Sequence, residues 1–367
     1  MKDLRVCLVG MFPPPLHGMS LINDHVRSCI SAKAPPLVVD YSPRNLDRSF
    51  MVRFGKLFRV QRCFFQLFSY LVTRRVGSVY LGLSGGNGQA YDTLFAGLCR
   101  VFGRKLYLHH HSYQYLDQPR WLSRLLFAIS GKNVVHIVAC EKMANDLKRL
   151  YPVVSEVRII SGIAALELWD GEVRCRDQIR SIGFLSNISI EKGILEFLDV
   201  AAWADQTRLP IHFLLAGPYQ DGEIKCLVEA RLAVLPNVTC VGAVYGSDKL
   251  AFFDSIDVFL MPSHNESEGL VIHEAMSRGV PVIAYSRGCI EQIISDQVGL
   301  RLVPSEDYVT GSIGKLNEWL LNPHVFQAAS QASLRRFNEA RSLHIERMES
   351  ICAEIIRCTE VMEKRKG

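Results

Sequence analysis

The chain has 367 residues, of which 49% are hydrophobic and 22% are charged, a composition that indicates a globular protein and excludes a disordered or low-complexity one. This length exceeds that of one ordinary core and predicts two domains. The formal charge of +5 is mild. It allows an anionic ligand or a membrane surface as partner, and we expect no nucleic acid partner.

The start of the chain and its cysteines indicate a compartment. The sequence opens Met-Lys-Asp-Leu-Arg and enters an apolar run at Val6, without the pattern of a secretory signal. Apolar stretches stay below the ~18–20 residues that a membrane span requires. The 11 cysteines form no CxxC pair and no regular spacing. We therefore expect a cytoplasmic protein, with peripheral association at the inner face of the membrane as an open alternative.

Short apolar runs alternate with helical patterns along the chain. In the first half they lie at 4–10, 79–83, 105–111, 136–140 and 157–161, and in the second half at 182–185, 211–217, 238–241, 258–262, 280–285 and 299–303. This alternation predicts parallel sheets covered by helices on both faces. Two such series predict an α/β fold with two Rossmann-like domains facing a cleft.

The domain boundaries follow from a change in composition. An apolar segment gives way to a charged stretch within 163–180, where we expect the linker. We accordingly expect an N-terminal domain at 1–165, a C-terminal domain at 166–345, and a final helix at 346–367. That helix is expected to cross back to the N-terminal domain.

Two features of the first half are candidate site elements. The first strand is followed by a Pro-rich loop that contains Gly18, a pattern equally typical of a structural turn. A later strand ends in His109, His110 and His111. Neighbouring strand residues point to opposite faces, so these histidines cannot share one direction. Their spacing also lacks the companion ligands of a metal site, and we predict no metal.

Cations and aromatic residues alternate at helical spacing in the segments 53–68 and 120–127. Such helices can lie on anionic membrane surfaces. Equally, they can pack their apolar side on a sheet while the arginines extend to solvent. Both interpretations stay open, and the first would favour a lipid-linked acceptor.

The segment 258–284 contains the strongest functional pattern. An apolar run ends at Pro262, a polar loop contains Glu266, and a helix is expected to begin near Leu270, with Glu274 on its first turns. The carboxyl ends of parallel strands are the place where open α/β sheets bind ligands. A helix N-terminus favours an anion. One site can thus hold a phosphate and offer two carboxylates to hydroxyl groups.

This segment resembles the E-x7-E motif of retaining GT-B glycosyltransferases, specifically glycosyltransferase family 4. The matching residues are Pro262, Ser263, Glu266, Gly269, Leu270, Val271, Glu274, Ala275, Met276 and the run 279–284. The resemblance is dense in the second half of the chain and loose in the first. It implies the GT-B architecture and a nucleoside diphosphate sugar as co-substrate, without a metal or other cofactor.

The resemblance also implies roles for individual residues. Glu274 would bond the ribose hydroxyls of the donor, and Glu266 would bond sugar hydroxyls and position the anomeric carbon. The diphosphate would be held by Lys192, by Gly18 and by the backbone at Gly269, Leu270 and Val271. His111 would contact the sugar from the other domain. The family usually has an arginine five residues before this lysine, where this chain has Asn187.

The resemblance therefore implies a retaining glycosyltransferase. It would transfer a sugar to a saccharide or lipid-linked saccharide, in bacterial-type surface polysaccharide or glycolipid synthesis. Two alternatives stay open: a sugar-nucleotide 2-epimerase of the same architecture, and a non-catalytic nucleotide-sugar-binding or membrane-docking protein. The family commonly has two adjacent glycines where this chain has His17 and Gly18. This departure and the one at Asn187 support the second alternative.

Overall fold

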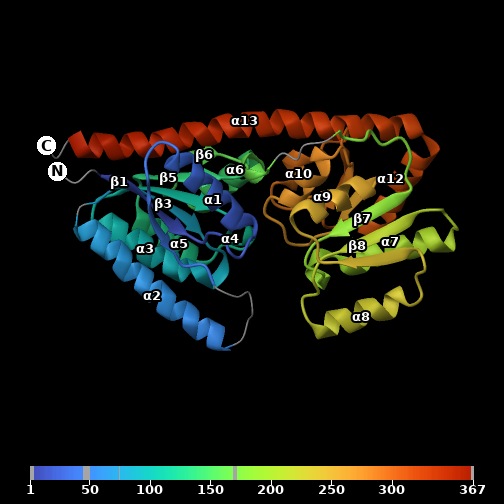
Figure 1. Cartoon of the computed structure of the whole chain (residues 1–367), viewed down its shortest axis with the longest axis horizontal. Coiled ribbons are helices and arrows are strands. Elements are labelled where there is room, and N and C mark those ends of the chain that lie inside the picture. Colours follow the sequence, from blue (N-terminus) through green and yellow to red (C-terminus); the bar gives the residue numbers. More distant parts are fainter. Residues whose placement is uncertain (1–3, 44–49, 74, 168–171, 365–367) are drawn as a thin grey trace. The chain divides into compact units, whose positions relative to one another are not determined.

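The computed structural model describes residues 4–43, 50–73, 75–167 and 172–364. The linker predicted at 163–180 is partly outside this set, as are the side chains of residues 50–56. The chain forms two compact units (Figure 1). One comprises Met1–Ala165 with Ser342–Gly367, and the other Leu166–Arg341. Each contains a six-stranded parallel sheet, which confirms two Rossmann-like domains.

The sheet of the first unit has the strand order β2-β1-β3-β4-β5-β6. Its strands are β1 (Arg5–Gly10), β2 (Leu37–Asp40), β3 (Val76–Leu83), β4 (Lys105–His110), β5 (Val134–Val138) and β6 (Glu156–Ile159). The sequence patterns did not predict β2. This strand lies at the edge of the sheet, and its three apolar residues, Leu37, Val38 and Val39, directly follow two prolines, a pattern more typical of a loop.

Helices cover both faces of this sheet. The bounds are α1 (Gly18–Ser31), α2 (Phe50–Val72), α3 (Gln89–Val101), α4 (Gln114–Asp117), α5 (Trp121–Ser130) and α6 (Glu141–Leu150). The chain moves in one direction from β1 to β2 and in the opposite direction afterwards. Because parallel crossovers are right-handed, α1 covers one face, and α2, α3 and α5 cover the other. These last three helices pack side by side, α3 between its two neighbours.

The sheet of the second unit has the order β12-β11-β10-β7-β8-β9. Its strands are β7 (Ser181–Leu185), β8 (His212–Ala216), β9 (Val238–Gly242), β10 (Val258–Met261), β11 (Val282–Tyr285) and β12 (Gly299–Leu302). Its helices are α7 (Ile194–Gln206), α8 (Gly222–Leu232), α9 (Gly246–Ser255), α10 (Leu270–Ser277), α11 (Ile290–Ile293) and α12 (Tyr308–Leu321).

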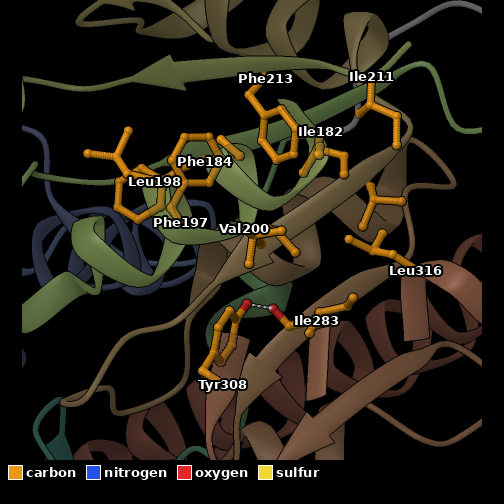
Figure 2. Packing of buried hydrophobic residues seen from close by; sticks show 14 of the residues in the cluster. Ile182, Phe184, Phe197, Leu198, Val200, Ile211, Phe213, Ile283, Tyr308 and Leu316 are labelled. Carbon is orange, nitrogen blue, oxygen red and sulfur yellow. Dashed lines mark hydrogen bonds between the residues drawn. The ribbon is translucent and has the colours of Figure 1, made fainter. Parts of the chain in front are cut away.

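The core of this unit lies between the sheet and helices α7 and α12 (Figure 2). Phe184 of β7, Phe197 of α7 and Phe213 of β8 pack ring against ring. The hydroxyl of Tyr308 donates a hydrogen bond of 2.6 Å to the carbonyl of Ile283. A buried polar group that is paired in this way stabilises the core instead of weakening it.

The long final helix, α13 (Pro323–Lys364), begins earlier than expected. Proline is favourable in the first helical turn, where its missing amide hydrogen costs no bond. From Ser342 onward the helix belongs to the first unit. There the Ser78 hydroxyl of β3 donates to the carbonyl of Ile355, at 2.9 Å. None of the helices in the described residues is both long and apolar enough to span a membrane.

Candidate functional site

The site of the second unit lies at the strand where the order of strands in the sheet changes direction. From β7 the chain moves to β8 and β9, and it then returns to β10 on the other side of β7. The loops after β7 and β10 therefore leave the same sheet edge in opposite directions. In open α/β sheets this reversal is the place where ligands bind.

The segment that follows β10 folds as the sequence predicted. Helix α10 begins at Leu270 and is preceded by Gly269, whose φ of 71° lies in the left-handed region. Within the described residues, no side chain caps this helix end. The backbone amides of Leu270 and Val271 thus belong to a helix N-terminus, which has a partial positive charge.

Lys192 and Glu266 come together at this edge. The Lys192 ammonium lies 2.8 Å from a carboxylate oxygen of Glu266 and donates to the carbonyl of Asn265 at 3.1 Å. The two side chains are 25% and 20% exposed, so solvent screens the pair less than a surface ion pair. Lys192 ends a short 3-10 turn that is capped by Ser189. The site thus holds a lysine and a carboxylate in direct contact.

Two close backbone approaches fix the loop that contains Glu266. A side-chain carbon at Gly288, where φ is 55°, would lie 2.4 Å from the carbonyl oxygen of Glu266. A carbon at Gly193, where φ is 80°, would lie 2.3 Å from the carbonyl oxygen of Pro262. Only glycine fits both positions. The Cys289 amide also donates to the carbonyl of Ser267 at 2.8 Å.

Glu274 of α10 forms an ion pair with Lys249 of α9. Burial raises the pKa of the Glu274 carboxyl, and the nearby Lys249 ammonium opposes this rise. The sequence patterns did not identify Lys249. It lies on the first turn of α9, where no local sequence pattern marks it as a partner of Glu274.

Asn187 lies exposed in the turn after β7 and adds no positive charge to the site. Its neighbour Ser186 contacts the turn after β8, because a side-chain carbon at Gly217 would lie 1.7 Å from the Ser186 carbonyl oxygen. The turns after β7 and β8 are therefore in contact. Lys192 and Lys249 are the lysines that contact the two glutamates of the motif.

Gly18 and His111 both lie in the first unit, at the ends of different elements. Helix α1 begins at Gly18 with His17 as its N-cap. The ring of His17 accepts from the Ser20 amide at 3.2 Å, and the Ser20 hydroxyl accepts from the His17 amide at 2.9 Å. This reciprocal capping gives a structural role to the histidine that replaces the family's glycine.

His111 follows β4 and shares a hydrogen-bond network centred on Asn23 of α1. The amide oxygen of Asn23 lies 3.1 Å from Nε2 of His111 and 2.8 Å from the hydroxyl of Tyr80. That hydroxyl also lies 2.7 Å from Nδ1 of His109. Burial lowers the pKa of His111 well below its usual value, with His109 and His17 adding to the shift. His111 is thus a neutral, oriented ring at neutral pH.

The sequence patterns missed Asn23, although a polar residue on the buried side of a predicted helix was a signal for it. His110 points the other way, as the alternation of strand residues predicted. Its ring nitrogens lie 2.6 Å from the hydroxyl of Tyr115 and 2.9 Å from Nδ1 of His136. In the described residues, no three of the His, Cys, Asp and Glu side chains are grouped so as to hold a metal ion.

Residues 179–322 match the family model described as glycosyl transferases group 1. The chain is 24% identical over 259 residues to the alpha-monoglucosyldiacylglycerol synthase of Streptococcus pneumoniae, a match that covers 64% of this chain and 57% of that enzyme. The chain therefore spans less than two thirds of that relative's length.

Two solved structures show the same fold over almost the whole chain. The sucrose-phosphate synthase of Thermosynechococcus elongatus matches with a TM-score of 0.70 at 16% identity, covering 97% of this chain and 98% of that one. Anabaena Alr3699/HepE, solved in complex with UDP and glucose, matches with a TM-score of 0.66 at 14% identity, covering 97% and 100%. The chain therefore has the GT-B fold, and its residues 179–322 match the glycosyl transferases group 1 model.

Proposed function

We propose that this protein is a retaining, glycosyltransferase family 4-like enzyme that transfers a sugar from a nucleoside diphosphate sugar to a hydroxyl of a saccharide or lipid-linked saccharide. The observation that carries the proposal is the contact of Lys192 with Glu266 beside the N-terminus of α10. A cation, a carboxylate and free helix amides at a strand-order reversal form a site suited to a phosphate with a sugar attached.

Each group has a distinct task in this reaction. The ammonium of Lys192 and the amides of Leu270 and Val271 hold the diphosphate and stabilise its charge as it departs. The bond between the anomeric carbon and the diphosphate oxygen breaks, and a bond from that carbon to an acceptor oxygen forms. The proton of the acceptor hydroxyl leaves with the diphosphate. Glu266 bonds the sugar hydroxyls, which positions the anomeric carbon.

Glu274 binds the ribose hydroxyls in this proposal, with Lys249 keeping its carboxylate charged. From the first unit, Gly18 adds a backbone contact to the diphosphate, and His111 presents a neutral ring to the sugar. Lys192 and the helix end supply the positive charge that a metal supplies in other transferases. We therefore propose turnover without a divalent cation, which assays with and without a chelator would test.

The acceptor and the cellular role are also proposals. The name of the pneumococcal relative, a glucosyldiacylglycerol synthase, supports a glycolipid or a lipid-linked saccharide as product class. Bacterial-type surface polysaccharide or glycolipid synthesis, on the cytoplasmic side of the membrane, fits this class. Asn187 replaces the family's arginine, so Lys192 carries more of the diphosphate binding in this chain.

The test has two steps. A thermal-shift screen against nucleoside diphosphate sugars should identify a donor that raises the melting temperature by mass action. Turnover with that donor is then followed with and without acceptor sugars, with the anomeric configuration of the product read by nuclear magnetic resonance. We expect donor consumption only with an acceptor, and a product of retained configuration.

The matched variants are Glu266→Ala and Glu223→Ala, the second on exposed α8 of the same unit. The first should lose turnover, and the second should retain it. Donor consumption without acceptor would indicate an epimerase instead. Donor binding without turnover over a broad acceptor panel would indicate a binding protein, and unchanged activity of Glu266→Ala would contradict the site.

A further inference from the structure

Three neighbouring helices form one face of the first unit: α2, α3 and α5 (Figure 1). They cover the sheet face opposite α1. Contacts join them along their length. The ring of Phe68 lies edge to face with Phe102, at 6.0 Å between centroids, and Gly97 of α3 lies against Ile129 of α5. We refer to the outward surface of these three helices as the outer face.

The outer face is apolar where an ordinary amphipathic layer would be polar. Helix α2 buries Val60, Cys63, Leu67 and Leu71 at helical spacing toward the sheet. The opposite stripe still exposes large apolar side chains, as do α3 and α5. They include Phe58, Phe65, Phe68, Val101, Trp121 and Leu125. Single exposed apolar residues are common, but a cluster over three adjacent helices marks an interaction surface.

The degree of exposure is high for these residue types. Val101 is 81% exposed, and Phe58 and Trp121 are each 74% exposed. Their side chains contact water over most of their surface. Removing this surface from water is favourable in proportion to its area. A partner of this face is therefore expected to be apolar at the point of contact.

The charges on these helices are almost all positive. Helix α2 contains three arginines and one lysine and no Asp or Glu, and α5 contains Arg124 and no acid. The acid in α3 is Asp92, which is buried and accepts the amide of Ser84 at 2.7 Å. Arg62, Arg100 and Arg124 are exposed. The outer face thus combines apolar and cationic groups without an exposed carboxylate on its helices.

One arginine of this segment has a different role. Arg59 donates to the carbonyl of Ser42, which attaches α2 to the loop after β2. Replacing it would disturb the fold as well as the charge. Arg62 and Arg124 are the cleaner probes of the surface, since both extend from exposed positions of their helices.

We propose that the outer face docks on an anionic lipid bilayer, with the aromatic residues entering the headgroup region and the arginines binding lipid phosphates. Charge complementarity favours this partner over a second copy of the chain, because two such faces would bring like charges together. Apolar burial alone, or attraction to anionic lipid alone, would give only weak binding. The two contributions together give stronger binding. The inference needs no enzymatic activity, so its outcome is independent of the proposed function.

The experiment is vesicle flotation of the full chain. One set of vesicles contains phosphatidylcholine alone, and the other contains about one third phosphatidylglycerol. We expect flotation with the anionic vesicles and little with the neutral ones. Raising the salt concentration should weaken binding, because exposed charges are screened. Absence of flotation with the anionic vesicles would overturn the proposal.

Two variant pairs separate the charge from the apolar contribution. Arg62→Gln with Arg124→Gln should reduce partitioning by about fivefold per charge. Phe58→Ser with Trp121→Ser should abolish it, while neither pair alters the melting temperature. Controls are Arg335→Gln with Arg357→Gln on α13, and Val234→Ser with Leu321→Ser in the second unit, all exposed positions. Controls and outer-face variants that float alike would overturn the proposal.

Light scattering after size-exclusion chromatography tests whether a second copy of the chain binds the outer face instead. A monomer in solution supports the lipid assignment. A dimer that is dispersed by Phe58→Ser with Trp121→Ser would assign the outer face to a second copy of the chain, and it would overturn the proposal.

Discussion

Lys192 and Glu266 meet at 2.8 Å although they are 74 residues apart in the chain. They follow β7 and β10, which pair in the sheet. In this contact the lysine and the carboxylate satisfy each other. A diphosphate is a stronger partner for the ammonium than one carboxylate, so in the proposed function donor binding would be an exchange of partners at a site that already contains both charges.

The first prediction concerns this exchange. Lys192→Met should weaken binding of a nucleoside diphosphate by about tenfold or more, because a charge-assisted hydrogen bond is lost. Isothermal titration calorimetry measures the affinity. Lys225→Met, on exposed α8, is the matched control and should bind like the unmodified chain. Equal affinities for the two variants would show that Lys192 is not a phosphate ligand.

The second prediction concerns pH. Lys249 opposes the burial that raises the pKa of Glu274, so Lys249→Met should raise this pKa further. Protonated Glu274 is a weaker partner for ribose hydroxyls, and nucleoside diphosphate affinity should fall as the pH is lowered. We expect this fall to begin at a higher pH in the variant than in the unmodified chain.

Affinities measured by calorimetry between neutral and mildly acidic pH test this shift. Lys249→Arg keeps the positive charge and should follow the unmodified chain. An identical pH profile for Lys249→Met would mean that Glu274 does not depend on this ion pair.

The third prediction concerns the support of the Glu266 loop. Gly288 has a left-handed backbone conformation. Gly288→Ala would place a side-chain carbon at this position, 2.4 Å from the carbonyl oxygen of Glu266. The free energy of unfolding should fall by about 1–3 kcal/mol, and turnover should fall with it as the loop shifts.

Gly222→Ala is the matched control, because Gly222 begins α8 and has open space around its α-carbon. Denaturant unfolding and turnover are measured on both variants. Gly222→Ala should be neutral or slightly stabilising. A Gly288→Ala variant with unchanged stability and activity would show that the loop does not need this close approach.

The fourth prediction concerns buried histidines. Burial lowers the pKa of His136 to about 4. An unfolded histidine titrates near 6.5, so between these values the unfolded state binds a proton that the folded state does not. Stability is complete above about pH 6.5 and falls with the pH toward 4. For His136 alone the loss at pH 5 is about 2 kcal/mol.

His136→Gln removes this titration and keeps a polar partner for His110. Calorimetric melting between pH 7 and 5 should show a smaller fall in melting temperature for this variant than for the unmodified chain. His212→Gln, at an exposed position, should keep the original slope. Parallel slopes for all three proteins would contradict the assignment to His136.

The apolar runs were sufficient to predict eleven of the strands, because most strands of a parallel sheet are buried on both faces and need continuous apolar residues. The start of α10 at Leu270 also followed from the sequence, through Gly269. The edge strand β2 did not, since the two prolines before Leu37 made its short apolar run typical of a loop. The early start of α13 was missed because Pro323 was not interpreted as a first-turn residue.

The residues of the candidate site also divide into those that the sequence identified and those that it did not. Glu266, Glu274 and Lys192 were identifiable because they belong to short local patterns of strand end, glycine and helix start. Lys249 and Asn23 were not, since each matters through a partner on another element. Strand order and helix packing determine which residues become such partners. Neither corresponds to a fixed spacing in the sequence.

The sequence by itself therefore determined the two α/β domains and the local geometry of the segment that contains Glu266 and Glu274, because periodicity and backbone chemistry act over a few neighbouring residues. The tertiary structure alone decided that Lys192 meets Glu266, that Lys249 pairs with Glu274, and that exposed apolar residues of α2, α3 and α5 form one face. These relationships depend on which strands pair and on which side each crossover lies. The packing of the whole domain determines both the strand pairing and the side of each crossover.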